Sequence, residues 1–222
     1  MKILALELST TLGSLAWLDD RFHHGSSVNG ATAAGDFDPP FASNWQNDRR
    51  NSGSFFEHLQ MAIKQFGLPE IIVVGLGPGS YAGTRIAISA AIGLQAAARA
   101  RLIGFPSVCA IEGIDDYAIV GDARRSSFYY ARIRERRLVE DFQLFREDEI
   151  HDKINQLDSG VRIISSDLLP QFKRVEQRFP SAMILAELGC SEEPGFRVPP
   201  LEPIYLREPH VTIPKPILQN SP

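Results

Sequence analysis

Two acidic residues, each directly after an apolar run, are the side chains of this sequence best placed for chemistry. Glu7 follows the first apolar run and precedes the hydroxyl residues Ser9 and Thr10, and Asp122 follows a second run in the other half of the chain. An acid at a strand tip beside a hydroxyl-rich turn can hold the phosphates of a nucleotide and its Mg²⁺. Because the two acids lie about half a chain apart, we expect a duplicated strand-acid-turn-strand unit whose copies form opposite walls of a cleft. The alternative is a pair of unrelated hairpins with solvated turns.

A glycine-rich loop is a further candidate for binding a phosphate. Gly77 and Gly79 lie in the segment Gly-Pro-Gly-Ser, between an apolar run over 71–74 and a helix expected over 84–99. Backbone amides in such a loop, together with a helix N-terminus, favour an anion. The Lys-Ser/Thr that completes a Walker A motif is missing, however, and the pattern G-x-G-x-x-G is not matched. The alternative is a tight strand-to-helix turn that needs glycine for the backbone alone.

Histidine, cysteine and serine give little support for nucleophilic or metal chemistry. The 5 histidines form no H-E-x-x-H or His-x-x-x-His pair, and the 2 cysteines have no C-x-x-C spacing. Cys109 is expected in the core on an apolar helix face, and Ser80 does not lie in a G-x-S-x-G elbow. We therefore expect no ATPase, kinase or peptidase activity from the isolated chain.

Length and composition are typical of a globular protein with a hydrophobic core. The chain has 222 residues, of which 44% are hydrophobic and 23% are charged. Its net charge of -4 lacks the cationic excess that supplies most non-specific affinity for nucleic acids, so the chain alone is not expected to be a main RNA binder. Two cysteines suit a reducing cytosol, and the opening segment resembles neither a signal peptide nor a membrane span. We therefore expect a cytoplasmic protein without membrane contact.

The order of apolar and polar segments predicts alternating strands and helices. In the first half we expect a hairpin of strands 3–8 and 13–18, a polar loop of turns and extended pieces over 19–53, a helix over 54–66, a strand over 71–74 and a helix over 84–99. Ser54 and Glu57 form a capping-box pattern for the first helix, and Gly67 is placed to end it. In the second half we expect a hairpin from 118 to 133, helices over 148–157 and 170–179, a strand over 161–165 and an extended proline-rich tail.

The expected helix over 84–99 has apolar residues on two sides. They form one stripe with Ile86, Ala90, Leu94 and Ala97, and a second stripe with Ile88 and Ile92. Three small residues at close helical spacing, Ser89, Gly93 and Ala96, would let another helix approach closely. The alternative is packing inside the protein's own core.

Four ordered segments resemble the TsaB (YeaZ) family. Residues 74–86, VGLGPGSYAGTRI, resemble that family's loop G-P-G-S-[FY]-T-G-[LV]-R-[IV]-G. Residues 1–10 (MKILALELST) resemble its opening I-L-A-[IL]-D-T-[AS]-T, residues 122–125 (DARR) resemble its D-A-R motif, and residues 203–207 (PIYLR) resemble its closing P-x-Y-[LV]-R. The resemblance thus spans nearly the whole chain.

This resemblance implies an α/β protein with the duplicated actin/Hsp70-like (ASKHA, ribonuclease H-like) fold in two lobes. The N-terminal lobe, 1–102, would carry the dimerisation helices, and the smaller second lobe, 103–222, would end in the extended C-terminal tail. The resemblance also implies that there is no catalytic residue, metal or required cofactor. A vestigial nucleotide site would be formed by Glu7, Ser9, Thr10, Gly77, Gly79 and Asp122.

The function implied by the resemblance is that of a non-catalytic scaffold. Such a subunit dimerises with TsaD and supports transfer of a threonylcarbamoyl group to the adenosine beside the anticodon of tRNAs that read ANN codons. The ATPase TsaE would join the pair, tRNA would bind only through the complex, and a homodimer is a further option. The interface would use the helices 54–66 and 84–99, with Phe55, Leu59, Arg85, Ile88, Ser89, Ile92, Gly93 and Ala96.

The sequence departs from the family pattern at several positions, and two other functions stay open. Glu7 replaces the usual Asp at the first strand tip, and Asn51 replaces the His that usually precedes the first helix. One alternative is an active actin-fold enzyme, either a small-molecule kinase or a glycoprotease-like peptidase. A kinase would need a glycine loop that clamps adenosine in the second half, where Gly189 is the sole glycine between Gly160 and Gly195. The other alternative is a homodimeric scaffold without a tRNA role.

Overall fold

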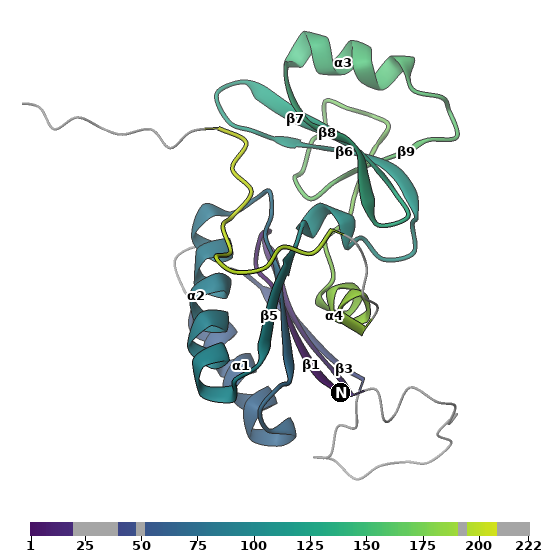
Figure 1. The fold of residues 1–222 in the computed structure, drawn as a ribbon. Helices are drawn as coiled ribbons and strands as arrows, with labels where there is room; N and C mark the ends of the chain where they lie inside the picture. Colours follow the sequence, from purple (N-terminus) through teal and green to yellow (C-terminus); the bar gives the residue numbers. More distant parts are fainter. Residues whose placement is uncertain (20–39, 48–51, 191–194, 208–222) are drawn as a thin grey trace, which may run out of the picture.

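Two five-stranded sheets, one in each lobe, organise the chain (Figure 1). The computed structural model describes residues 1–19, 40–47, 52–190 and 195–207. The first sheet has the order β3-β2-β1-β4-β5, with β1 Lys2–Glu7, β2 Leu12–Asp19, β3 Phe41–Gln46, β4 Ile71–Gly75 and β5 Arg101–Phe105. The second has the order β10-β9-β6-β7-β8, with β6 Asp116–Asp122, β7 Ser127–Arg134, β8 Arg137–Arg146, β9 Arg162–Ser165 and β10 Val175–Gln177.

The two sheets repeat one topology. In the first, β1, β2 and β3 form an antiparallel meander, and β4 and β5 continue on the other side of β1 as parallel strands. In the second, β6, β7 and β8 form the meander, and β9 and β10 are the parallel strands. Glu7 and Asp122 end the corresponding strands β1 and β6. The expected duplicated fold with two lobes is therefore confirmed.

Helices cover the outer faces of both sheets. Alternate residues of a strand point to opposite faces, so Leu4 and Leu6 lie in a core with α1 (Gly53–Phe66) and α2 (Tyr81–Ala98). Ile3 and Ala5 face a central core shared with α4 (Ala182–Cys190), the short helix η2 (Ser107–Cys109) and the second sheet. The helix α3 (Glu147–Gln156) covers the far face of the second sheet. The central core joins the two lobes.

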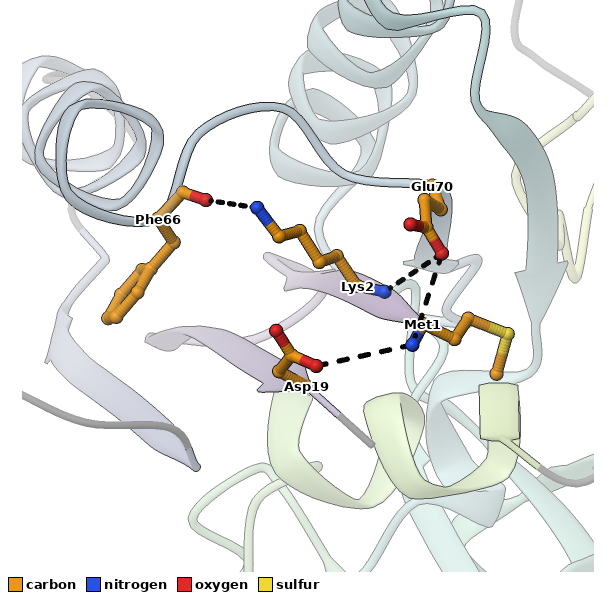
Figure 2. Close-up of polar contacts among 5 residues, drawn as sticks. All are labelled: Met1, Lys2, Asp19, Phe66 and Glu70. Atoms are coloured by element: carbon orange, nitrogen blue, oxygen red, sulfur yellow. Dashed lines mark hydrogen bonds and ion pairs between the residues drawn. The ribbon is translucent and has the colours of Figure 1, made fainter. Parts of the chain in front are cut away.

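The first helix does not begin at the expected capping box. Its N-cap is Ser52, whose side chain makes no capping hydrogen bond, so Ser54 lies inside the first turn. The expected end is confirmed, because Gly67 has a φ of 85° and its amide donates to the Ile63 carbonyl over 2.9 Å. The Lys2 ammonium also donates to the carbonyl of Phe66 over 3.1 Å (Figure 2), where a cation complements the helix dipole.

Polar contacts with the loop before β4 fix the start of β1. The Lys2 amide donates to Glu70 Oε2 over 3.2 Å, and the Met1 ammonium lies 4.0 Å from Glu70 Oε2 and 4.0 Å from Asp19 Oδ1 (Figure 2). Asp19 is almost fully buried, so its contact with the ammonium lies at the edge of the core. These contacts link the start of β1 to the end of β2 and to Glu70, the residue that precedes β4.

The second helix begins three residues before its expected start. Ser80 is the N-cap, and its side-chain oxygen accepts a hydrogen bond from the Gly83 amide over 3.2 Å. The fully buried face consists of Gly83, Thr84, Ala87, Ile88 and Ala91. Of the expected stripes only Ile88 lies on this face, whereas Ile86, Ala90 and Leu94 are half-buried beside it.

Two further expectations are corrected by the structure, and one helix was not expected. The expected polar loop over 19–53 contains β3, an edge strand, although residues 20–39 and 48–51, including Asn51, lie outside the described part. The expected helix over 170–179 is wrong, because this segment forms turns and β10. The helix α4 was not expected, and it packs against β1, β2 and β4 of the first lobe. The expected lobe boundary after residue 102 lies inside β5.

The described part of the C-terminal segment, 195–207, is extended as expected and lies along the first lobe (Figure 1). Arg197 and Gly104 exchange two backbone hydrogen bonds of 2.8 Å, and the Ile204 amide donates to the carbonyl of Leu76 over 2.8 Å. Leu201 is buried against the core of the first lobe. In the part of the chain that the structure describes, no helix is both long and apolar enough to cross a membrane.

Candidate functional site

The tips of β1 and β6 meet at one cavity between the lobes, as the duplicated fold predicts. The cavity has a volume of about 170 Å³ and is lined by Ser9, Thr10, Thr11, Pro78, Gly79, Ser80, Asp122, Ala123, Arg124, Tyr129, Ser166, Asp167 and Leu206. Four of the six expected site residues are therefore brought together, namely Ser9, Thr10, Gly79 and Asp122. Glu7 and Gly77 do not line the cavity.

The carboxyl group of Glu7 is turned into the protein and not toward the cavity. The side chain is fully buried, and Oε1 accepts a hydrogen bond from the Ser9 amide over 2.6 Å. Oε2 is also buried and has no hydrogen-bond partner among the described residues. It lies beside the Cα of Gly75, at the end of β4, and near the Ser107 hydroxyl. Glu7 therefore connects three elements of the first lobe instead of contacting a ligand.

Burial changes the acidity of this carboxyl group. Desolvation raises the pKa of Glu7 above its usual value of 4.5, and polar contacts with Ser107 and Ser9 oppose the shift only in part. A carboxyl group in this position favours its neutral form more than a solvated one does. It is poorly suited to hold a cation, for which a charged carboxylate is needed.

Asp122 does face the cavity, but its carboxylate already has a cationic partner. Arg124 Nη1 lies 2.9 Å from Asp122 Oδ2, and the Arg124 amide donates to Oδ1 over 2.6 Å. The turn that brings Arg124 back onto Asp122 has three successive positive φ angles, 65° at Arg124, 53° at Arg125 and 54° at Ser126. This left-handed backbone is uncommon for residues other than glycine, so the local fold holds the Arg124–Asp122 pair in place.

Asp167 is a second acid of the cavity that the sequence reasoning missed. Its Oδ2 accepts a hydrogen bond from the Asp122 amide over 2.8 Å, and its own amide donates to Ser165 Oγ over 3.0 Å. The signal was present, because Asp167 comes two residues after the apolar strand β9, much as Asp122 ends the apolar strand β6. Burial first, and then the nearby Asp167 carboxylate, raise the pKa of Tyr129 on the same wall.

The glycine-rich loop packs against the tip of β1 and uses its amides inside the protein. The Gly77 amide donates to Ser107 Oγ over 2.9 Å, and the Ser80 amide donates to the Ser9 carbonyl over 2.5 Å. A Cβ at Gly79 would lie 2.0 Å from the Ser9 carbonyl oxygen, so this position admits no side chain. Of the two interpretations left open by the sequence, an anion cradle and a tight turn, these contacts favour the tight turn, whose glycine allows close backbone contact.

These residues do not fit a bound nucleotide with its metal. Ligand cavities usually have volumes of roughly 300–1,000 Å³, and this cavity has about 170 Å³. Of the two strand-tip acids, Glu7 is buried away from it and Asp122 is paired with Arg124. Within the described ranges, no group of three or more His, Cys, Asp or Glu side chains is placed to hold a metal ion.

Cys109 lies in the core, as expected. It is 1% exposed on η2, in the central core between the lobes. Desolvation raises the pKa of its thiol to about 12, against a smaller opposite effect of Arg136. The thiol is therefore protonated at neutral pH.

The expected interface residues divide into an exposed group and a buried group. Ser89, Gly93 and Ala96 are exposed on α2, and we call these three residues the α2 small-residue surface. Ile92 is exposed on the same helix. Phe55, Leu59 and Ile88 are at most 8% exposed and pack against the first sheet, so they belong mainly to the protein's own core. Arg85 is exposed, and its Nη1 donates to the Tyr81 hydroxyl over 2.5 Å.

An apolar groove lies beside this surface, between α1 and α2. It has a volume of about 540 Å³ and is lined by Phe56, Leu59, Gln60, Ile63, Lys64 and Leu94. Phe56, one of the lining residues, is strongly exposed at 49%. The sequence reasoning included Leu59 in the interface and missed Phe56.

Comparison with known proteins identifies the fold. The chain matches no protein-family model and no curated protein. It is similar to a solved structure described as an uncharacterised protein with similarity to peptidase YeaZ from Pseudomonas aeruginosa, with a TM-score of 0.65 and 17% identity over 93% of this chain and 99% of that one. It is also similar to YeaZ from Pseudomonas aeruginosa, with a TM-score of 0.60 and 17% identity over 86% of this chain and 91% of that one. The chain therefore has the YeaZ-like fold, with its duplicated topology in two lobes.

Proposed function

We propose that this chain is a non-catalytic scaffold subunit that supports a TsaD-type subunit in threonylcarbamoylation of the adenosine beside the anticodon of tRNAs reading ANN codons. The observation that carries the proposal is the α2 small-residue surface. The YeaZ-like fold and the four sequence segments that resemble the TsaB family support the choice of partner.

Gly93 is the residue of this surface that the protein's own fold does not explain. A Cβ built at Gly93 meets no atom within 4 Å, and the residue lies exposed in the middle of an 18-residue helix. Glycine inside a helix costs roughly 0.5–1 kcal/mol of stability relative to alanine. A residue that is kept small at this cost is explained by a partner backbone that comes close to α2, as small residues permit between packed helices.

The area around Gly93 has the character of an interface. The α1–α2 groove is lined largely by apolar side chains, and Phe56 in its lining is strongly exposed. Exposed apolar area of this kind is typical of a protein interaction site. A helical pair from the partner would cover the groove and bring its backbone against Gly93.

The cavity between the lobes supports a role without catalysis. Asp122 is paired with Arg124, Asp167 accepts a hydrogen bond from the Asp122 amide, and Glu7 is buried away from the cavity. A kinase or a peptidase would need free acids or a nucleophile with a base at this place. The kinase and peptidase alternatives therefore have less support than a scaffold.

The proposal is tested by co-expressing the chain with the TsaD of its own host and substituting Gly93→Leu. We expect the native chain to co-purify with TsaD and the variant to lose it, because the leucine side chain would keep the partner backbone away. Gly160→Leu is the matched control, since Gly160 also has open space at its Cβ but lies in the second lobe. Both variants should melt at or above the native temperature.

Three results separate this function from its alternatives. The proposal would be supported if depletion of the protein removed threonylcarbamoyladenosine from tRNA. The Gly160→Leu variant should then restore the modification, and the Gly93→Leu variant should not. A chain that forms a dimer alone through Gly93 and captures no TsaD would instead establish the homodimeric scaffold. Unchanged capture of TsaD by Gly93→Leu would show that the interface lies elsewhere.

A further inference from the structure

A second cavity, lined by three arginines, lies where the end of β5, the β7–β8 hairpin and the segment after Gly195 meet. Its volume is about 350 Å³, and its lining residues are Phe105, Pro106, Cys109, Arg136, Arg137, Leu138, Gly195 and Arg197. We infer that this cavity binds the phosphoryl group of a small phosphate ester. The inference goes beyond the proposed scaffold role and does not depend on it.

Positive charge is concentrated at this cavity on a chain whose net charge is -4. The described lining contains three guanidinium groups and no acidic side chain. The neighbouring Asp115 lies 3.8 Å from Arg136 and is itself 79% exposed, so this pair is weak. Within the described part of the chain, no hydrogen bond or ion pair engages the Arg197 guanidinium. An anion is the ligand that this charge distribution favours.

The backbone holds two of these arginines in fixed positions. Glu135 and Arg136 form the turn between β7 and β8, with φ angles of 47° and 61°. Hairpin turns of this kind usually contain Asn-Gly, because other residues are strained there. Arg136 also donates a hydrogen bond to the Ile111 carbonyl, which orients its guanidinium. Arg197 is fixed through its two backbone hydrogen bonds with Gly104.

The shape of the guanidinium group favours phosphate over other anions. Arginine offers several donors in a planar fork, which matches phosphate oxygens and binds them in pairs. Arg136 and Arg137 are neighbours on the β7–β8 hairpin, and Arg197 lies on the segment after Gly195, so guanidinium groups from two segments line the cavity and can contact a tetrahedral dianion from two sides. A planar carboxylate offers only two oxygens, so it can accept hydrogen bonds from fewer of these guanidinium groups.

The rest of the lining favours an ester over the free ion. Phe105, Pro106 and Leu138 form an apolar wall beside the arginines, and the Phe105 ring packs on Phe196 with 5.1 Å between the ring centroids. A volume of about 350 Å³ lies within the usual range for small-molecule sites, roughly 300–1,000 Å³. A small ring or short carbon chain attached to the phosphate would contact this wall.

Phenyl phosphate is the probe that tests the inference, with binding to the full chain measured by isothermal titration calorimetry. We expect saturable binding with one site, and we expect Arg137→Gln and Arg197→Gln each to weaken it by about tenfold, because each removes a charge-assisted hydrogen bond. Arg134→Gln is the matched control. It removes the same charge from the same hairpin, but Arg134 pairs with Asp116 and does not line the cavity, so binding should change less than about twofold.

Inorganic phosphate and benzoate distinguish the parts of the inference. Both should bind at least about tenfold more weakly than phenyl phosphate, since one lacks the ring and the other lacks the tetrahedral dianion. The inference would be overturned if inorganic phosphate or benzoate bound as tightly as phenyl phosphate. It would also be overturned if Arg134→Gln weakened binding as much as Arg137→Gln or Arg197→Gln, or if phenyl phosphate did not saturate the protein up to about 10 mM. Melting temperatures of all three variants show whether each protein is folded, and Arg137→Gln and Arg197→Gln test the site independently.

Discussion

Glu7 Oε2 lies so close to Gly75 that a Cβ on Gly75 would stand 1.9 Å from it. The carboxyl group therefore occupies the space that a side chain at the end of β4 would fill. Glutamate is one methylene longer than the aspartate usual at this strand tip in the TsaB family. The missing side chain of Gly75 leaves room for the carboxyl group inside the lobe, and this contact explains why Glu7 does not reach the cavity.

We expect Gly75→Ala to destabilise the protein by about 2 kcal/mol or more, because a methyl group cannot be placed here without moving both Glu7 and Ser107. The free energy of unfolding from urea titration measures the effect. Gly93→Ala is the control, since its Cβ has open space, and it should be neutral or slightly stabilising. Adding Glu7→Asp to Gly75→Ala should recover part of the loss, because the shorter side chain withdraws the carboxyl group. Strictly additive losses in the double variant would argue against the contact.

The buried carboxyl group makes stability depend on pH in a direction that can be derived. Burial raises the pKa of Glu7 above the usual 4.5, so the folded protein binds this proton more tightly than the unfolded chain. Its stabilising contribution is complete below the unfolded value and is lost as the pH rises through the folded value.

Glu7→Gln removes this titration and keeps the shape of the side chain. We therefore expect the melting temperature of Glu7→Gln relative to the native protein to increase as the pH is raised from about 4.5 toward neutrality. Glu7→Ala leaves a hole beside Gly75 and should be less stable than the native protein at every pH. A difference between Glu7→Gln and the native protein that is constant with pH would contradict the burial of this carboxyl group.

We expect the isolated protein to show no ATP turnover above background. Asp122 is paired with Arg124, and the cavity between the lobes, at about 170 Å³, is smaller than the usual ligand cavity of roughly 300–1,000 Å³. A coupled assay for ADP release over a range of ATP concentrations measures this. Saturable turnover that Asp122→Ala abolishes would favour the kinase alternative.

Transfer RNA should bind the isolated chain only weakly. A net charge of -4 supplies little of the electrostatic attraction that dominates non-specific binding to nucleic acids. Gel-shift titrations at physiological salt, with and without TsaD, compare the chain with the complex, and we expect tight binding only with the partner present. A sub-micromolar affinity of the chain alone would contradict the scaffold role.

The repeat that defines the fold could be predicted because it rests on local signals. The runs before Glu7 and Asp122 are apolar enough to mark buried strands, and the turn residues after them mark hairpins. The strand β3 was missed because its sequence, FASNWQ, is that of an edge strand with alternate residues in contact with solvent. The helix α4 was missed because AMILAELGC is apolar on nearly every side, which gives no helical periodicity.

The candidate site could be predicted in position and not in detail. Ser9, Thr10 and Asp122 lie at the ends of β1 and β6, which are the corresponding strands of the two repeated sheets, and all three line the cavity. The inward turn of Glu7 depends on Gly75, which lies 68 positions after it in the sequence. The Lys2–Glu70 contact, at the other end of the same strand pair, spans the same sequence separation. The Arg124–Asp122 pair depends on a left-handed turn without glycine. Tertiary contacts decide both features, and residue types alone do not reveal them.

The helix α4 also determines the order in which the protein can be completed during synthesis. Its first amide, at Ala182, donates to Ser14 Oγ over 3.0 Å, a contact between residues 168 positions apart. On the ribosome, the strands of the first sheet emerge well before α4, and at about 5–20 residues per second the interval lasts several seconds. During this time the sheet face with Ile3 and Ala5 has no helix to cover it. We therefore expect this face of the nascent N-terminal lobe to be exposed to aggregation until α4 has been made, and a chaperone that shields it to raise the yield of folded protein.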